Sequence, residues 1–380
     1  MDMKTNMPAR VRPLVPFLAS FALFVGGCAT APPAARPATP PSAPRSAVFP
    51  GERWERVPSP AAVRFSPAGL EAVLSHARKL ATTSFVVVVN GRILLDYGDT
   101  THLSYIASVR KSVLAMLYGN YVEAGKIRLD KTLRELGISD IGGLSDGELE
   151  ATVSDLLGAR SGVYHPASYG GDDLASAPPR NSQRHGTYYL YSNWDFNVLG
   201  TIFEKETGRD IYDAVETDLA KPIAMQDFKR ELQKKEGDLT ASSHPAYPMW
   251  FSTRDMARIG YLMLRGGRWA GRQLVPATWV RRIVAVNTPV TEMNPPHYRT
   301  ERLGYGYLWW VFDGPQARDN FAGAYTGVGA GGQFITVLPA LDLVVAHKTD
   351  FRGGKPTVSR EQYLSLLDDI VAAHCPGPCS

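Results

Sequence analysis

The sequence predicts an α+β fold, with an antiparallel sheet flanked by helices and a mostly helical second lobe. Two strand-like stretches near the beginning are joined by a hairpin signal, helical periodicity dominates the middle of the chain, and strand-like stretches return near the end. Because a lone hairpin is marginally stable in water, the strands of both ends should share one sheet. The helical middle then forms the second lobe, and a functional site is expected where the two lobes meet.

The strands are predicted from short apolar runs that are bounded by turn residues. Residues 84–89 and 93–97 flank Asn90-Gly91, the strongest short-range signal for a hairpin. The remaining strands are expected at 305–312, 333–338 and 343–347.

The helices are predicted where apolar residues recur with a period near 3.6 and capping residues mark the ends. Gly208 and Gly266-Gly267 each follow a periodic stretch, and Pro276 occupies a position that favours the start of a helix. The predicted helices span residues 109–124, 155–157, 195–207, 253–265, 276–286 and 359–374.

The first residues have the pattern of a targeting segment. Basic residues precede an apolar run at 14–25, which is too short to span a membrane, and Gly26-Gly27-Cys28 follows. A cysteine after two glycines resembles a bacterial lipobox, which implies that residues 1–27 are a lipoprotein signal peptide and that Cys28 carries a lipid. Ala29 at the next position favours the outer membrane by the same resemblance. An ordinary signal peptide that contains a cysteine is the alternative.

Residues 28–57 are rich in Pro and Ala and should form an extended tether, whereas 58–380 is long enough for one large domain or two closely packed ones. The protein is therefore expected in the periplasm, anchored to the membrane through its lipid. The formal net charge of the whole chain is only +4, and this argues against a nucleic acid partner. Cys375 and Cys379 could form a disulfide in an oxidising compartment, but the sequence leaves their pairing open.

The most informative motif is Ser108-Val109-Arg110-Lys111, at the start of a predicted helix. Residues three apart lie on one helix face, about 5–6 Å apart at Cβ, so Lys111 can reach the Ser108 hydroxyl. The helix N-terminus also favours negative charge that develops on the serine oxygen. Ser108 is therefore a candidate nucleophile. The alternative is a simple N-cap serine followed by a solvated lysine.

A second motif, Tyr191-Ser192-Asn193, lies just ahead of another predicted helix. A phenol near a lysine ammonium should have a lowered pKa and can pass a proton to a leaving group. Asn193 can donate an amide N–H to a substrate carbonyl. Tyr118-Gly119-Asn120 has the same spacing, but it lies inside a predicted helix, where packing is the expected role.

A third motif is the glycine-rich run 327–333, which leads into a predicted strand. Glycines at a strand edge let a ligand approach the backbone, so Gly329 and Ala330 are candidate substrate-binding residues. A strained loop between strands is the alternative. Lys348-Thr349-Asp350 follows a strand instead of opening one, and no role in the site is expected for it.

Two other hydrolase types fit the sequence poorly. Gly143-Leu144-Ser145-Asp146-Gly147 matches a nucleophile elbow, but it lacks the buried strand that must precede one. The eight histidines are scattered without the pairs that hold a catalytic metal, so no metal is expected. Nucleophilic catalysis by a serine needs no other cofactor, so none is expected.

Together, the three motifs resemble the serine β-lactamase/penicillin-binding-protein-like superfamily, in particular its class C β-lactamase, carboxylesterase and 6-aminohexanoate-oligomer hydrolase-like branch. The resemblance implies a β-lactamase/DD-peptidase-like fold and one role for each motif residue. Ser108 would be the acylating nucleophile, Lys111 its activating amine, Tyr191 the acid/base and Asn193 an orienting group. The backbone N–H groups of Ser108 and Ala330 would form the oxyanion hole.

The sequence therefore predicts a serine hydrolase that acts on a small ester, amide or lactam through an acyl-enzyme. A true β-lactamase or DD-peptidase, or a non-catalytic penicillin-binding-like protein, are the alternatives. The lactamases of this group carry a cation at the third motif, where this chain has Tyr325 and Ala330. Esters and neutral amides are thus expected to be favoured over penicillins, unless Arg180 or Arg184, from a segment expected to roof the site at 164–189, supplies the charge.

Overall fold

The structure is a computed structural model that describes residues 47–379, which form one compact unit. The predicted signal peptide, Cys28 and most of the predicted tether lie outside the described residues. Within 47–379, no helix is long and apolar enough to cross a membrane.

A seven-stranded antiparallel sheet joins the two ends of this unit, with β1 beside β11. Strands from the beginning and the end of the chain thus share one sheet, as predicted. In spatial order the strands are β2 (Arg92–Gly98), β1 (Ser84–Val89), β11 (Leu343–Lys348), β10 (Gln333–Leu338), β9 (Tyr325–Gly329), β8 (Trp310–Phe312) and β7 (Leu303–Tyr305).

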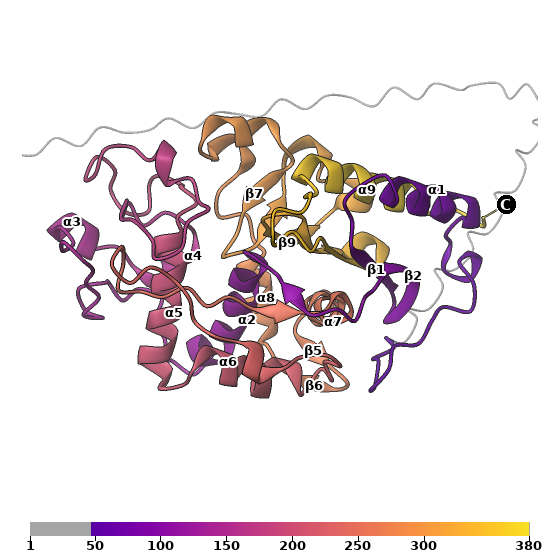
Figure 1. Cartoon of the computed structure of the whole chain (residues 1–380), viewed down its shortest axis with the longest axis horizontal. Coiled ribbons are helices and arrows are strands. Elements are labelled where there is room, and N and C mark those ends of the chain that lie inside the picture. The colour runs from indigo at the N-terminus through magenta and orange to yellow at the C-terminus, as the bar shows by residue number, and fades with distance from the viewer. Residues whose placement is uncertain (1–46, 380) are drawn as a thin grey trace, which may run out of the picture. The chain divides into compact units, whose positions relative to one another are not determined.

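Helices cover both faces of the sheet, because successive side chains of each strand point to opposite sides. On one face, α7 (Thr253–Leu264) packs so closely that a Cβ on Gly260 would lie 2.5 Å from Val344 and 2.8 Å from Ile335. On the other face, Phe334 stacks on Tyr363 of α9 (Arg360–Ala372) at 3.7 Å. α1 (Pro67–Ala77) lies beside α9 (Figure 1).

The middle of the chain forms the helical part, and α2 (Val109–Glu123) is buried between it and the sheet. α2 contacts β9 and β10 on one side and α5 and α8 on the others. The helices of the middle and those next to it are α3 (Asp146–Leu149), α4 (Val153–Leu157), α5 (Asn193–Thr207), α6 (Ile211–Ala214), a π-helix (Val215–Ala220) and α8 (Ala277–Ile283). Two small pairs complete the fold: β3 (Ser104–Tyr105) with β4 (Trp250–Phe251), and β5 (Arg268–Trp269) with β6 (Arg272–Gln273).

The structure differs from the prediction in the strands near the end of the chain. Residues 305–312 were expected to form one strand, but β7 and β8 are separated by a turn in which Leu308 has a φ of +59°. No strand was predicted at β9, where the glycine-rich run 327–333 begins, although β9 pairs with β10 along its length. The sheet therefore takes five strands from the end of the chain, where three were predicted.

Packing also extends to the N-terminal side of residue 58, into the range predicted as a tether. The Tyr261 hydroxyl donates to the Val48 carbonyl at 2.7 Å, and Arg258 donates to the Gly51 carbonyl at 2.8 Å. Trp54 lies under the same guanidinium at 5.1 Å. Residues 47–57 therefore belong to the compact unit, since buried groups of α7 need their carbonyls as partners.

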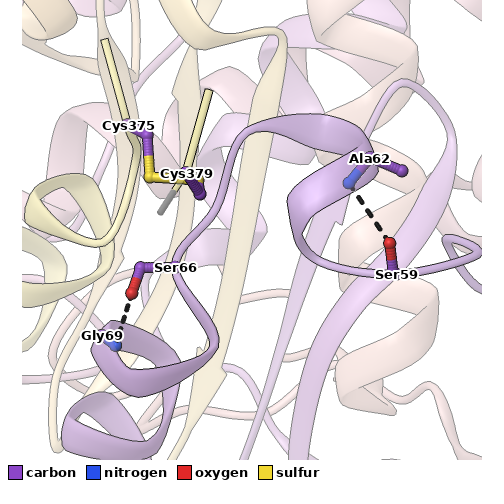
Figure 2. The surroundings of a disulfide bond; sticks show 6 residues. All are labelled: Ser59, Ala62, Ser66, Gly69, Cys375 and Cys379. Carbon is purple, nitrogen blue, oxygen red and sulfur yellow. Dashed lines mark hydrogen bonds between the residues drawn. A yellow bond between two sulfur atoms is a disulfide. The ribbon is translucent and has the colours of Figure 1, made fainter. Parts of the chain in front are cut away.

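Cys375 and Cys379 form a disulfide just after α9 (Figure 2). The N–H of Cys375 donates to the Arg64 carbonyl at 2.8 Å, and Ser66 next to it caps α1 by accepting from the N–H of Gly69. The pairing that the sequence left open is thus present. It closes a small loop at the point where the end of the chain meets the start of α1.

Candidate active site

Ser108 stands at the start of α2, at the wall of a cavity of about 310 Å³. Ala107 before it has a φ of +47°, a left-handed conformation that is strained for alanine and sharply turns the chain into the helix. Within the described residues, the Ser108 side chain caps no backbone N–H. Its Oγ accepts a hydrogen bond from Lys111 Nζ at 2.9 Å. The alternative of a capping serine with a solvated lysine is therefore wrong.

Lys111 joins the first two motifs, although they are far apart in the sequence. Its side chain is 1% exposed, and Nζ also donates to the Tyr191 hydroxyl at 2.7 Å and to Asn193 Oδ1 at 2.6 Å. Tyr191 precedes α5 and Asn193 is its first residue, so the start of α5 faces the start of α2. The structure thus brings four predicted residues into one hydrogen-bonded cluster.

The electrostatics of this cluster differ from the prediction. Burial lowers the pKa of Lys111 well below its ordinary value, and the neighbouring Arg110 lowers it further. Burial raises the pKa of Tyr191, although a hydrogen bond with Ser108 opposes the rise. The expectation that a lysine ammonium lowers the phenol pKa is therefore wrong, because desolvation outweighs it. An uncharged amine has two N–H groups, which can donate to Asn193 and Tyr191. Its contact with Ser108 Oγ is then reversed, so that the amine nitrogen can take the serine proton.

Asn193 is engaged on both sides of its amide. Its Oδ1 holds Lys111, while Nδ2 donates to the carbonyls of Tyr169 at 3.1 Å and Gly170 at 2.9 Å. Its backbone N–H donates to Asp172 Oδ2 at 2.8 Å. The sequence predicted donation to a substrate carbonyl, but the amide instead connects the lysine to the segment predicted to be a roof.

The glycine-rich turn between β9 and β10 also lines the cavity, to which Gly329, Ala330 and Ser108 all contribute. A Cβ on Gly329 would lie 2.6 Å from the Ile106 carbonyl and 3.2 Å from the Ala107 Cβ. The end of β9 therefore packs against the backbone that leads into Ser108. This contact requires glycine and places the third motif next to the first.

The roof prediction is correct for residues 171–173, which line the cavity. The two arginines that the sequence left open as a source of positive charge do not line this cavity. Arg180 donates to Glu148 at 2.8 Å, and Arg184 lines a separate cavity of about 460 Å³.

The cation that sequence reasoning missed is Arg360, the first residue of α9, which lines the cavity. It donates to Glu301 Oε2 at 2.5 Å and lies 4.5 Å above the Trp310 ring. Asp172 and Asp173 line the same cavity. Arg360 belongs to no motif, and the one sequence signal for it was the start of the closing helix beside the sheet.

The residues set aside on the sequence have structural roles. The Tyr118 hydroxyl donates to the Leu199 carbonyl at 2.6 Å in the core between α2 and α5, and Ser145 caps α3 in a capping box. Lys348 is buried at the end of β11 and donates to the carbonyls of Ser104 and Phe251, so it holds β3 and β4. Among residues 47–379, no group of His, Cys, Asp and Glu side chains is placed to hold a metal ion.

The sequence matches the family described as Beta-lactamase over residues 68–366. A similar protein is the 6-aminohexanoate-dimer hydrolase of Paenarthrobacter ureafaciens, which is 25% identical over 292 residues that cover 70% of this chain and 71% of that protein.

Solved structures are similar as well. A putative 6-aminohexanoate-dimer hydrolase from Bacillus anthracis has a TM-score of 0.59 and 20% identity, covering 79% of this chain and 81% of that one. A penicillin-binding protein homolog from Caulobacter crescentus has a TM-score of 0.57 and 15% identity, covering 81% and 98%. These likenesses confirm the predicted fold class.

Proposed function

The chain belongs to the Beta-lactamase family of hydrolases, and from the cluster around Ser108 we propose that it hydrolyses a small ester or amide through a Ser108 acyl-enzyme. The observation that carries the proposal is the contact of Lys111 Nζ with Ser108 Oγ, Tyr191 OH and Asn193 Oδ1, at 2.9, 2.7 and 2.6 Å. A serine, a buried amine and a phenol in one network are the parts that nucleophilic catalysis requires.

The reaction follows from these positions. Lys111 takes the proton of Ser108 as Oγ attacks the substrate carbonyl, and the N–H groups of Ser108 and Ala330 stabilise the oxyanion. Tyr191 gives its proton to the leaving alcohol or amine and regains one from Lys111. A water molecule then attacks the acyl-enzyme, the proton returns through the same pair, and Ser108 is restored. Asn193 holds the lysine in place.

The charges of the cavity favour a substrate without a carboxylate next to the scissile bond. Asp172 and Asp173 line the cavity, and its cation, Arg360, is already paired with Glu301 at 2.5 Å. A substrate carboxylate would face two acidic groups and compete with Glu301 for the guanidinium. Short-chain esters and neutral amides are therefore proposed as the substrates in preference to penicillins.

The proposal extends to the location of the enzyme. The run Gly26-Gly27-Cys28 after a short apolar segment supports lipid attachment at Cys28. The enzyme would then act in the periplasm while a lipid anchor holds it to the membrane, the outer one on the basis of Ala29.

Covalent labelling tests the nucleophile. The full-length protein should react with a fluorophosphonate probe at Ser108, and the Ser108→Ala variant should lose both labelling and turnover. Ser108→Ala should keep its thermal stability, because the hydroxyl caps no backbone group among the described residues. Ser145→Ala is the matched control: it should keep labelling but lose about 1 kcal/mol of stability with its cap. Labelling that persists in Ser108→Ala would refute the assignment.

Kinetics on p-nitrophenyl butyrate and nitrocefin test the substrate class side by side. The ester should have the higher kcat/KM. A nitrocefin kcat/KM of about 10⁵ M⁻¹s⁻¹ or more with negligible ester hydrolysis would identify a true β-lactamase instead. Stable labelling of Ser108 without turnover of either compound would identify a binding protein.

A further inference from the structure

Arg110 is a buried cation in the first turn of α2, between Ser108 and Lys111 in sequence. It is 2% exposed, and its guanidinium lies 4.2 Å from the centre of the Tyr247 ring. Nη2 donates to Asn197 Oδ1 at 3.1 Å, while Nη1 has no hydrogen-bond partner among the described residues. Within residues 47–379, no carboxylate lies within ion-pair distance of this guanidinium.

Such a residue is costly for the fold. Arginine stays protonated in proteins, and a buried charge without a carboxylate partner pays a desolvation penalty that an amide and an aromatic ring offset in part. An apolar side chain of similar length would fill the same space without this penalty. A buried charge without an ionic partner acts on the titratable groups near it, and Lys111 is the next residue in the chain.

We propose that Arg110 is a positioning residue that keeps Lys111 in its uncharged amine form, so that Lys111 and not Tyr191 takes the first proton from Ser108. The inference rests on the proposed function, because it assigns the base in that reaction. Arg110 itself contacts no reacting atom in this assignment and acts through the charge state of Lys111.

The surroundings of Lys111 support this division of roles. Burial lowers its pKa most, and Arg110 lowers it further, whereas the two aspartates raise it. The pKa of Tyr191 is raised by its burial, so the phenol keeps its proton and is suited to donate it. The groups that face Lys111 are Ser108 and Arg110 of α2, Tyr191 and Asn193 at the start of α5, and Asp172 and Asp173 of the roof.

The test is the pH dependence of kcat/KM for p-nitrophenyl butyrate. The acid limb of the wild-type profile should report the pKa of Lys111, since the protonated lysine cannot act as the base. Arg110→Met removes the charge and keeps the length, so the limb should move to higher pH. Asp172→Asn removes the opposite charge and should move the limb to lower pH. Loss of packing cannot produce two opposite shifts.

Asn197→Ala provides the structural control, because it removes the hydrogen-bond partner of Arg110 and leaves the charge in place. It should lower stability without moving the limb to higher pH. An unchanged limb in Arg110→Met, or the same alkaline shift in both variants, would overturn the inference.

Two further readouts keep the test decisive. If Arg110→Met fails to fold, the acid limb of the Asp172→Asn profile carries the test. A limb that does not move to lower pH would then overturn the inference. Fluorophosphonate labelling of the wild-type protein separates failure of the proposed function from failure of the role assigned to Arg110. An unlabelled Ser108 contradicts the proposed function itself, whereas a labelled Ser108 with unshifted profiles contradicts the role of Arg110 alone.

Discussion

At the scale of single residues, hydrogen-bond partners and position in the fold distinguish side chains that occur in motifs of the same spacing. Tyr118 and Tyr191 both precede an asparagine by two positions, and both are buried. Tyr118 donates to a helix carbonyl in the core, whereas Tyr191 accepts from Lys111 and lines the cavity. The motif order predicted which tyrosine belongs to the site. The direction of its pKa shift was not predictable, because that direction depends on how completely the fold excludes water.

Tyr191→Phe should lower kcat/KM by about 10²–10⁴-fold, the range typical of a lost acid or base, with little change in Tm. Tyr118→Phe is its matched control. It should leave kinetics unchanged and cost about 1 kcal/mol in the free energy of unfolding, because the hydrogen bond to the Leu199 carbonyl is lost. Steady-state kinetics and urea unfolding of both variants are the measurements. A damaging Tyr118→Phe beside a silent Tyr191→Phe would reverse the assignment.

At the scale of elements, the sequence predicted strands and helices whose own composition favours them. β1 and β10 match the prediction because they are runs of β-branched and aromatic residues. α1 was missed although Ser66 and Pro67 carry its start signals, and β9 was missed because glycine is depleted in strands. β9 exists because its neighbour β10 pairs with it and because only glycine fits where Gly329 meets Ile106.

Gly329→Ala should therefore disturb the site by displacing β9, the strand that ends at Gly329. The new Cβ would lie 2.6 Å from the Ile106 carbonyl and 2.9 Å from the Gln333 Cβ, so β9 or the backbone before Ser108 must shift. A shift of this kind should lower kcat/KM at least about 10²-fold, because misplaced reacting groups lose orientation.

Gly147→Ala is the matched control for this prediction. Gly147 lies in α3, and a Cβ there would meet nothing within 4 Å. The substitution should leave kcat/KM unchanged and raise the free energy of unfolding by up to about 1 kcal/mol, since alanine favours a helix. Wild-type kinetics in Gly329→Ala would show that the close approach does not position Ser108.

At the scale of the whole molecule, the cavity gathers segments from the beginning, middle and end of the chain. α2 supplies Ser108, the roof supplies Asp172 and Asp173, the turn after β9 supplies Ala330, and α9 supplies Arg360. The motif residues were predictable, since each motif has a local spacing with a chemical reason. Arg360 was not, because its place in the cavity follows from the packing of α9 on the sheet. The charge balance that selects a substrate is thus a property of the assembled fold.

The anchoring prediction also belongs to the whole molecule. Cys28→Ser should move the protein from the membrane to the soluble periplasmic fraction or leave it unprocessed. Attached acyl chains contribute about 0.8 kcal/mol of membrane affinity per buried CH₂, whereas a polar, proline-rich segment after Cys28 offers little apolar surface to lipid. Fractionation with a palmitate label measures both effects.

The Cys375→Ser/Cys379→Ser variant is the control: it removes the disulfide beside α1 but should stay labelled and membrane-bound. Wild-type protein in the soluble fraction without label would contradict lipidation at Cys28.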